Sequence, residues 1–560
     1  MVTPILHSTA GALLIAGAAL IATGTPVQLA VQNGAGGLPA LPSEPRSGAD
    51  EMFLTGDRCL GCHKGVVTSE GIDVSIGYDW RATMMANSAR DPYWQAAVRR
   101  EILDYPEAAS AIEDKCSRCH MPMANASARA AGRPGAVFDN LPVGRDDADE
   151  ARLAADGVSC AACHQITSGG LGSEASFTGG FRIATETPAI GRTVFGPFEP
   201  DTGGQGIMHS ATGFRPTEGA HVQSSDLCAT CHTVFTHSLR PNGEEGPEFP
   251  EQAPYLEWRE SAAAAEGTSC QDCHMPEVGE DVPVTRVLGR PRSNVSRHVF
   301  RGGNFFMLRM LNRYREELGV SALPHELSLA ADRTERHLRE ATVFLSVSDA
   351  QVSDGQLEAV IEVRNHAGHK FPTAYPSRRA WLHVTIRDGG GRTVFESGAF
   401  SSDGRVAGSD NDQNPTRYEP HYTEITSPDQ VQIYEAIMLD GDGRVTTGLM
   451  SAERWAKDNR LLPAGFERSD ADPRIAVFGQ ATSDADFQPG LDRIRYAIDV
   501  DPARGPFTVV AELWFQPIAY RWAQNLAEYE SMETQRFTRY YQSMSSSSAL
   551  VLAADSTVVR

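Results

Sequence analysis

The most regular hydrophobic pattern lies in the second half of the chain. From about residue 340, short runs of β-branched and aromatic residues alternate with polar residues, and Gly, Asp and Pro separate one run from the next. Alternation in period two predicts strands that bury one face. The runs cover residues 342–349, 357–365, 380–388, 431–439, 493–500 and 507–517. This many strands in a short stretch predicts an antiparallel β-sandwich-like domain over 341–545.

The first half follows a different pattern. Two stretches there have helical character: YDWRATMMANSARDPYW, residues 78–94, and PHELSLAADRTERHLREA, residues 324–341. We predict a mostly helical, loop-rich domain over 45–320 and a linker helix over 321–340. The fold class is therefore expected to be α+β and multidomain, with two architectural units rather than the larger number that length alone suggests.

The N-terminus has its own apolar pattern. Residues 1–43 carry no charged side chain, and AGALLIAGAALIA, residues 10–22, has the length of a signal-peptide core and is short for a membrane span. Ala22 and Gly24 offer a cleavage site, although no Lys or Arg precedes the run. We predict a signal peptide or N-terminal anchor over 1–36, with cleavage favoured, and export to the periplasm or the extracellular side.

Composition narrows the function classes. The 560 residues include 50 Lys and Arg against 72 Asp and Glu, which gives a net charge of −22. A nucleic-acid binder would need a basic surface, so that class is excluded. Hydrophobic residues make up 41% and charged residues 22%, as in folded proteins. Ten cysteines are too few for a disulfide scaffold of this length.

The ten cysteines form five identical motifs. They read CLGCH (59–63), CSRCH (116–120), CAACH (160–164), CATCH (228–232) and CQDCH (270–274), and no cysteine is left over. Cys-x-x-Cys-His is the attachment sequence of c-type haem, in which two thiols bind one porphyrin and the histidine binds its iron. The predicted attachment residues are Cys59, Cys62, Cys116, Cys119, Cys160, Cys163, Cys228, Cys231, Cys270 and Cys273. The predicted proximal ligands are His63, His120, His164, His232 and His274.

Two other uses of these cysteines fit less well. Zinc sites would pair the motifs and leave a fifth one over, and disulfides would not require a histidine after every pair. We therefore predict five covalent haem c groups. The motifs follow one another at irregular spacings, which excludes a solenoid of equal repeats. The spacings are also too short for separate cores, so we expect closely packed haems shared between neighbouring segments.

Each haem iron has a second axial position, which His, Met, water or a substrate can fill. Apart from a histidine in the predicted signal, no non-motif histidine precedes residue 209. Early haems must therefore use later histidines, use Met or stay open. The candidates for the second position are His209, His221, His237, His298 and Met85. His325 and His337, on the predicted linker helix, are secondary candidates.

The segment NHAGHKFPTAYPSRRAWLHV, residues 365–384, places histidine, lysine and arginine side chains between two predicted strands. One interpretation is a structural role at the turn. The other is that His369 binds a haem iron, or that Arg378 and Arg379 pair with haem propionates where the second domain docks. The acidic runs 402–414 and 439–443 lack the spacing of a calcium-binding EF-hand and are predicted to be solvated turns.

Several stretches resemble the multihaem c-type cytochromes that carry the cytochrome c-552/4 domain. They are DGVSCAACHQI with GSEASFTGGF, SDLCATCHTVF, YLEWRESAAAAEGTSCQDCHMP, HVFRGGNFFMLRML, GHKFPTAYPSRRAWLH and DNRLLPAGF. The resemblance covers most of residues 55–320 and parts of 340–520. It implies periplasmic or outer-surface electron transfer, but the wider group also includes enzymes, so it does not settle activity.

Two function classes remain. The leading hypothesis is an electron carrier whose partners are other cytochromes or a quinol-linked membrane complex, with association steered by the acidic surface. The alternative is a haem oxidoreductase that acts on a small nitrogen or sulfur compound, such as nitrite or hydroxylamine, at an open haem. Pentahaem nitrite reductases often have a Cys-x-x-Cys-Lys motif, which is absent here. Membrane association through the N-terminus, an oligomer and a haem filament are further hypotheses.

Overall fold

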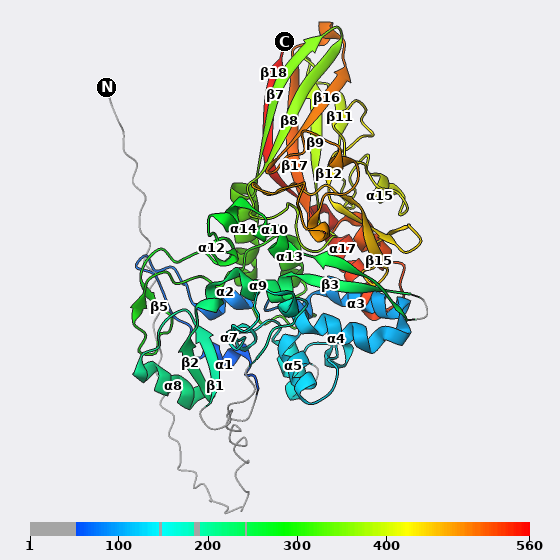
Figure 1. Ribbon diagram of the computed structural model, residues 1–560. Helices are drawn as coiled ribbons and strands as arrows, with labels where there is room; N and C mark the ends of the chain where they lie inside the picture. The colour runs from blue at the N-terminus through cyan, green and yellow to red at the C-terminus, as the bar shows by residue number, and fades with distance from the viewer. Residues whose placement is uncertain (1–51, 145–147, 184–190, 241–242) are drawn as a thin grey trace, which may run out of the picture. The chain divides into compact units, whose positions relative to one another are not determined.

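The computed structural model describes residues 52–560 except 145–147, 184–190 and 241–242 (Figure 1). The predicted signal peptide or anchor over 1–36 lies outside the described residues. The described residues all belong to one compact unit. No helix within the described part of the chain is both long enough and apolar enough to cross a membrane.

Short helices joined by loops dominate the first part of this unit. They are α1 (Gly56–Leu60), α2 (Ile76–Arg81), α3 (Pro92–Asp104), α4 (Ala109–His120), α5 (Pro122–Ala130), α6 (Asp149–Ala155), α7 (Cys160–His164), α8 (Thr202–Thr212), α9 (Ser225–His232), α10 (Pro254–Arg259), α11 (Ala262–Ala265), α12 (Cys270–His274), α13 (Phe305–Arg313) and α14 (Pro324–Ala341). The helix expected at 324–341 is thus confirmed as α14.

Three two-stranded ribbons lie between these helices. β1 (Arg192–Gly196) pairs in parallel with β2 (Phe214–Glu218). β3 (Val234–Leu239) and β4 (Glu245–Gln252) are antiparallel, as are the very short β5 (Val282–Pro283) and β6 (Pro291–Arg292). The sequence analysis predicted none of these strands, because their residues do not alternate over a long enough run.

Two larger sheets form the second part of the unit. One has the order β10 (Thr393–Ser397), β9 (Arg379–Arg387), β17 (Phe507–Gln516), β18 (Leu550–Val559), with β12 (Ile433–Tyr434) also paired to β9. The other has the order β11 (Glu424–Ile425), β16 (Leu491–Asp499), β8 (Gln356–Asn365), β7 (Val343–Ser353). A third, smaller sheet has the order β14 (Val445–Thr446), β13 (Ala436–Asp440), β15 (Ala452–Asp458). All pairs in these sheets are antiparallel except β11 with β16.

The predicted strands agree with this arrangement. β7, β8, β9, β16 and β17 lie where period-two alternation places them, and the run 431–439 is divided between β12 and β13. The inward faces of β8, β9, β16 and β17 belong to one buried cluster, as expected when two sheets pack face to face. The mixed α and β character is therefore confirmed, whereas the division into two domains stays a prediction.

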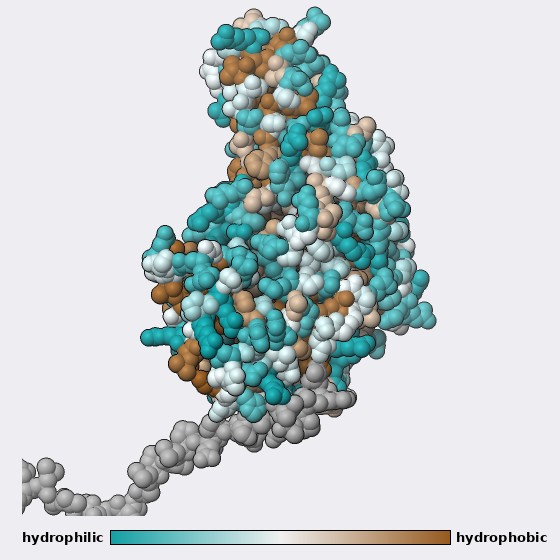
Figure 2. Space-filling model, turned by 60° about the vertical axis from the view of Figure 1, so that its left-hand side comes forward, coloured by the Kyte–Doolittle hydropathy of each residue, from teal (hydrophilic) through white to brown (hydrophobic). Residues whose placement is uncertain are grey.

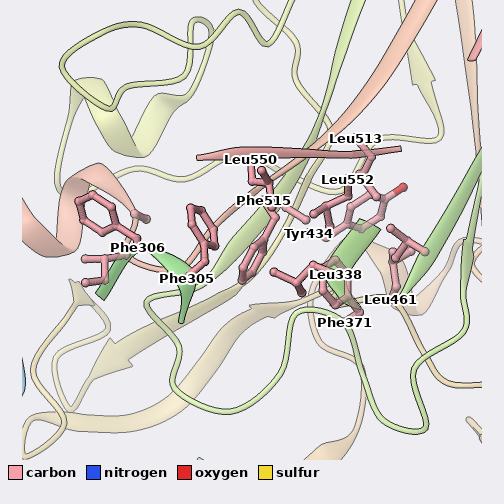
Figure 3. Packing of buried hydrophobic residues seen from close by; sticks show 14 of the residues in the cluster. Phe305, Phe306, Leu338, Phe371, Tyr434, Leu461, Leu513, Phe515, Leu550 and Leu552 are labelled. Carbon is pink, nitrogen blue, oxygen red and sulfur yellow. The ribbon is translucent and has the colours of Figure 1, made fainter. Parts of the chain in front are cut away.

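The core continues from the sheets into the helices that precede them. Figure 3 shows Phe305 of α13 and Leu338 of α14 beside Phe515 of β17, with Phe306 on the far side of Phe305. The ring centres of Phe305 and Phe515 are 6.4 Å apart, and those of Phe371 and Phe515 are 5.5 Å apart. Phe371 belongs to the loop between β8 and β9, so this loop is anchored in the core shared by helices and sheets.

Two sequence expectations differ from the structure. The stretch 78–94 is not one helix: α2 ends at Arg81, turns follow, and α3 begins at Pro92. Asp91 caps α3 by accepting from the backbone N–H groups of Tyr93 and Trp94, and an Asp-Pro pair starts a helix rather than continuing one. The sequence analysis also missed α15 (Asp410–Gln413), α16 (Tyr520–Leu526), α17 (Met532–Met544) and β18, which extends the sheet past residue 545.

The two acidic runs lie in different environments. Asp442 is exposed, as a solvated turn requires, and its side chain forms an ion pair with Arg444 at the surface. Asp412, in the other run, is almost fully buried and binds the Arg379 guanidinium through two contacts of 2.8 and 2.9 Å. The expectation of a solvated turn is wrong for Asp412, because a buried arginine needs its carboxylate.

Candidate haem sites

Each Cys-x-x-Cys-His motif begins on a helical turn. The motifs that start at Cys160, Cys228 and Cys270 lie wholly within α7, α9 and α12, and the second motif ends α4. The first motif starts on α1, and the backbone N–H of His63 still donates to the carbonyl of Cys59 (3.0 Å). In a helix, residues three and four apart share a face. Both thiols and the imidazole of a motif can therefore address one bound group.

Four of the five motif histidines, His63, His120, His164 and His274, use Nδ1 for a backbone contact. Nδ1 lies 2.8 Å from the Val284 carbonyl oxygen in His63 and 2.5 Å from that of Phe195 in His164. His120 makes the longer contact, 3.4 Å, to Ser88. A carbonyl can only accept, so Nδ1 carries the proton and Nε2 is left as a lone-pair donor. This is the arrangement that a metal-binding imidazole needs.

A cavity of about 730 Å³ connects the first four motifs. Cysteines of the first four motifs line it, together with His63, His120, His164, His232 and His298. The rest of its wall is mainly apolar, with side chains such as Ile112, Val158 and Phe198. An apolar cavity bordered by thiols and imidazoles suits a large hydrophobic group that bonds covalently and through a metal.

Thiols of different motifs lie against one another. The side chains of Cys59 and Cys160, of Cys119 and Cys231, and of Cys228 and Cys270 are in hydrogen-bonding contact. Cys163 also lies close enough to Cys231 for the two thiols to interact electrostatically. The first motif is thus next to the third, and the fourth is next to the second, third and fifth. This closeness agrees with the expectation that the five sites share their surroundings.

Two motif histidines face a second imidazole. The rings of His164 and His298 have centres 6.3 Å apart and lie 22° from parallel. The rings of His274 and His369 are also 6.3 Å apart and lie 13° from parallel. In both partner histidines Nδ1 contacts a backbone carbonyl oxygen, that of Ser296 at 3.2 Å and that of Lys370 at 2.8 Å. His274 likewise uses Nδ1, which contacts the Arg301 carbonyl oxygen. Nδ1 is thus occupied in all four rings, which leaves each Nε2 free for a metal.

The ring separation has a simple interpretation. With metal–nitrogen bonds of about 2.0–2.1 Å and about 1.1 Å from each nitrogen to its ring centre, two imidazoles on one metal have centres about 6.3 Å apart. Both imidazole pairs match this spacing. Direct ring stacking would bring the centres closer, as in the 4.4 Å stack of Trp94 on His120. The residues present therefore fit an iron held between two histidines at the third and fifth motifs.

Burial keeps these imidazoles neutral. Burial lowers the pKa of His120 and of His274 to about 4, and that of His298 to about 3. It also lowers the pKa of His164, His232 and His369. A charged imidazole has no lone pair for a metal, so a neutral one is prepared for ligation.

The other candidates for the second axial position are placed less decisively. Met85 lines the cavity, whereas His209, on α8, His221 and His237 are not among its lining residues. His221 lies against Phe195 and its Nε2 is 2.8 Å from the Ile166 carbonyl oxygen. His237 faces Glu248 across the β3–β4 ribbon. In the described part of the chain, no second imidazole pairs with His63, His120 or His232. These four candidates stay predictions.

The two arginines of the 365–384 segment have separate environments. Arg379 is buried and forms an ion pair with Asp412, so its guanidinium is not available to pair with a haem propionate. Arg378 lines the cavity and donates to the Thr373 carbonyl and to Asn304, and in the described residues no carboxylate pairs with it. Burial lowers its pKa to about 10. An anionic group in the cavity would stabilise this guanidinium.

Three side chains near the motifs escaped the sequence analysis or were underrated by it. Trp94 stacks on His120 with an angle of 5° between the rings, and nothing in the local sequence signals this contact. His337, on α14, lies 6.3 Å from His274 at 66°. His369 had a usable signal, since Gly, Lys and Pro surround it between two strands, in a place where a loop can reach another segment.

Comparisons with known proteins add little. No family model matches the chain, and no curated protein matches it, so the resemblance to the cytochrome c-552/4 family stays a prediction. Among solved structures, the crystal structure of a penta-heme cytochrome c552 from Thermochromatium tepidum is similar over 92% of this chain and 100% of its own. The identity is 14% and the TM-score 0.49. These values are too low to carry an argument about this chain.

Proposed function

We propose that the chain is a multihaem c-type cytochrome that transfers electrons through five covalently bound haems. Haem c supplies a one-electron redox couple when bound. The observation that carries the proposal is the pair of imidazole–imidazole spacings of 6.3 Å, each of which begins at a motif histidine. Five complete motifs, and an apolar cavity lined by the cysteines of four of them, support it.

The imidazole pairs support specific ligand assignments. We assign His164 and His298 to the third motif, and His274 and His369 to the fifth. His63, His120 and His232 are the proposed proximal ligands of the other three motifs. His209, His221, His237 and Met85 remain candidates for the second position there. Two histidines on one iron favour a low reduction potential, whereas a methionine would raise it.

The contacts between motifs support a branched array. Because the cysteines of the fourth motif touch those of the second and fifth and lie close to those of the third, this motif is the proposed junction. The first motif is connected to this array by its contact with the third motif. Sites so close together can act as one conducting unit, with different motifs available to a donor and an acceptor.

Location and partners follow from the sequence. Covalent haem attachment takes place outside the bacterial cytoplasm, so we propose export through the N-terminal apolar run, to the periplasm or beyond. With a net charge of −22, the surface suits a basic or membrane-associated redox partner. The face in Figure 2 is mostly hydrophilic, with small hydrophobic patches, which agrees with a transient partner rather than a permanent one.

The spin state of the irons tests this proposal. In the ferric holoprotein, an electron carrier with two axial ligands on every iron shows only low-spin signals by paramagnetic resonance. We expect low-spin signals from at least the third and fifth sites. A spectrum in which no site is low-spin would contradict both ligand assignments and the proposal built on them.

The polar part of the cavity favours a second candidate function. Arg378 and Tyr375 line the wall that also includes His232, and Arg378 is close enough to His232 to lower its pKa further, after burial. A guanidinium without a carboxylate beside an imidazole that lacks a partner ring would suit a small anion. The alternative is thus a haem oxidoreductase that acts on a compound such as nitrite. A high-spin signal in intact protein that shifts on addition of cyanide or nitrite supports this alternative, and its absence excludes it.

A further inference from the structure

His369 depends on a loop for its position. It lies between β8 and β9, and two imidazoles compete for the space beside His274: His369 at 13° and His337 at 66°, both with ring centres at 6.3 Å. His337 is fixed by the regular geometry of α14. A loop has no such constraint, so something outside it has to hold the His369 ring.

Buried charges hold this loop immediately after the histidine. The Lys370 ammonium lies 2.7 Å from Asp458 and also donates to the carbonyl of Ala476 (3.1 Å). Lys370 and Asp458 are 0% and 1% exposed. Asp458 in turn accepts two hydrogen bonds of 2.8 Å from Arg460. Although burial raises the pKa of Asp458, Arg460 and Lys370 lower it to about 2, so this carboxylate stays ionised in ordinary buffers.

The network continues into the segment that carries the fifth motif. Arg460 Nη1 lies 2.9 Å from Oε1 of Glu257, which belongs to α10 and is 0% exposed; the contact is an ion pair without an aligned hydrogen bond. The other carboxylate oxygen of Glu257 accepts from the Thr373 hydroxyl, four residues after His369. A charged contact at Lys370 and a hydroxyl contact at Thr373, both after the histidine, thus tie its loop to α10.

Backbone contacts hold the same loop from the β side. Phe371 and Leu461 exchange two backbone hydrogen bonds of 2.9 and 2.8 Å. The side-chain amide of Asn365 donates to the carbonyls of His369 (2.9 Å) and Leu461 (3.0 Å). These bonds hold the loop against Leu461 and Asn365, whereas the charged side chains fix where the loop meets α10.

We propose that the buried charge network Lys370–Asp458–Arg460–Glu257 is a positioning device that presents His369, rather than His337, to the metal-binding side of His274. Buried ion pairs add little net stability compared with apolar packing, but each charge tolerates only the geometry that pairs it. The network holds two positive and two negative charges. All four are paired only when the loop takes this position. The proposal rests on the proposed function, because it requires His274 to bind a haem iron.

The test uses paramagnetic resonance and redox titration of the ferric holoprotein with its full haem complement. His369→Ala removes the assigned ligand, and Asp458→Asn removes the charge that holds Lys370 and Arg460. We expect both variants to alter the same low-spin signal, one of five, and to shift the midpoint potential of that one site. His337→Ala should leave this signal unchanged, but in the double variant Asp458→Asn/His337→Ala the site should become high-spin.

Asp412→Asn is the matched control, because Asp412 also pairs with a buried arginine, Arg379, but makes no contact with the His369 loop. It should leave all signals unchanged. If His369→Ala loses a low-spin signal and Asp458→Asn retains all signals and potentials, the positioning role is overturned while the proposed function stands. If His369→Ala changes nothing, the assignment of His369 fails, and with it this proposal.

A milder variant covers the case in which Asp458→Asn does not fold. Thr373→Val removes only the hydroxyl that donates to Glu257. We expect it to shift the g values of the low-spin signal that His369→Ala alters, by less than Asp458→Asn would. An unchanged signal in folded Thr373→Val would overturn the proposal.

Discussion

The imidazole rings of His164 and His298 lie with their centres 6.3 Å apart and only 22° from parallel, although 134 positions separate them in the sequence. His164 ends the third motif, and His298 lies in a loop after the fifth. Their separation is the distance at which one metal can bind both rings. This pair shows that a later histidine folds back against an early motif, which is one of the outcomes that the shortage of early histidines allows.

Removing His298 should therefore affect one iron only. In His298→Ala we expect about a fifth of the iron, the share of one motif in five, to change from low-spin to high-spin, as followed by paramagnetic resonance and by cyanide binding. His237→Ala, in which the lost ring lies outside the cavity lining, is the control that leaves the third site low-spin. An unaltered spectrum of His298→Ala would remove this residue from the ligand set.

Trp94 should contribute strongly to stability through its stack on His120. Its ring is 8% exposed and lies 4.4 Å from the imidazole. Trp94→Ala loses buried area and the stack, so we expect a loss of about 3–5 kcal/mol in the free energy of unfolding. Trp94→Phe keeps part of the stack and should lose clearly less. Urea unfolding of the three proteins measures both values; equal losses in the two variants would show that the stack contributes nothing.

Removing only the carboxylate from the pair of Arg379 and Asp412 should strongly lower the free energy of unfolding. Asp412→Ala leaves a fully buried guanidinium without its carboxylate, and we expect a loss of about 3–5 kcal/mol. The exposed pair of Asp442 and Arg444 is the control, and Asp442→Ala should change stability by less than about 1 kcal/mol. Denaturant unfolding compares the two. Similar small losses would mean that Arg379 finds another partner.

The buried carboxyl of Asp492 should make the stability of the protein depend on pH. Burial raises the pKa of this carboxyl to about 6, despite the hydrogen bond from Tyr434. The folded state therefore binds a proton that the unfolded chain releases near pH 4, so the contribution of Asp492 to stability falls as pH rises from about 4 to 6. The shift corresponds to roughly 3 kcal/mol. The stability difference between wild type and Asp492→Asn should change by this order over that range. A difference independent of pH would contradict the raised pKa.

The sequence predicts those parts of the fold that depend on local pattern. β8 and β17 alternate strictly, and α14 begins with Pro324 and keeps its apolar stripe, so all three follow from the sequence. β3, β5 and α17 do not, because short ribbons and a helix with few apolar residues are stabilised by tertiary contacts. The break between α2 and α3 was readable from Asp91 and Pro92, but the apolar residues on either side concealed it.

The candidate site divides in the same way. The proposed attachment and proximal residues follow from the five motifs because covalent chemistry fixes their spacing. For the second position the sequence offers His298 and His369 as candidates but not the motif histidine that each faces, since they reach these partners through folding rather than through sequence distance. For Arg379 the sequence left open a structural role or a pairing with a propionate, and the residue pairs with Asp412, because a sequence does not reveal which buried carboxylate a buried arginine will meet.

The mass of the denatured, exported protein tests the central claim most directly. Haem attached through two thioether bonds stays with the chain when the protein unfolds, whereas a metal held by thiolates is lost. The account predicts the mass of the polypeptide plus five haem groups, with no free thiol left for alkylation. A mass that corresponds to the polypeptide alone, with ten cysteines open to alkylation, would contradict it.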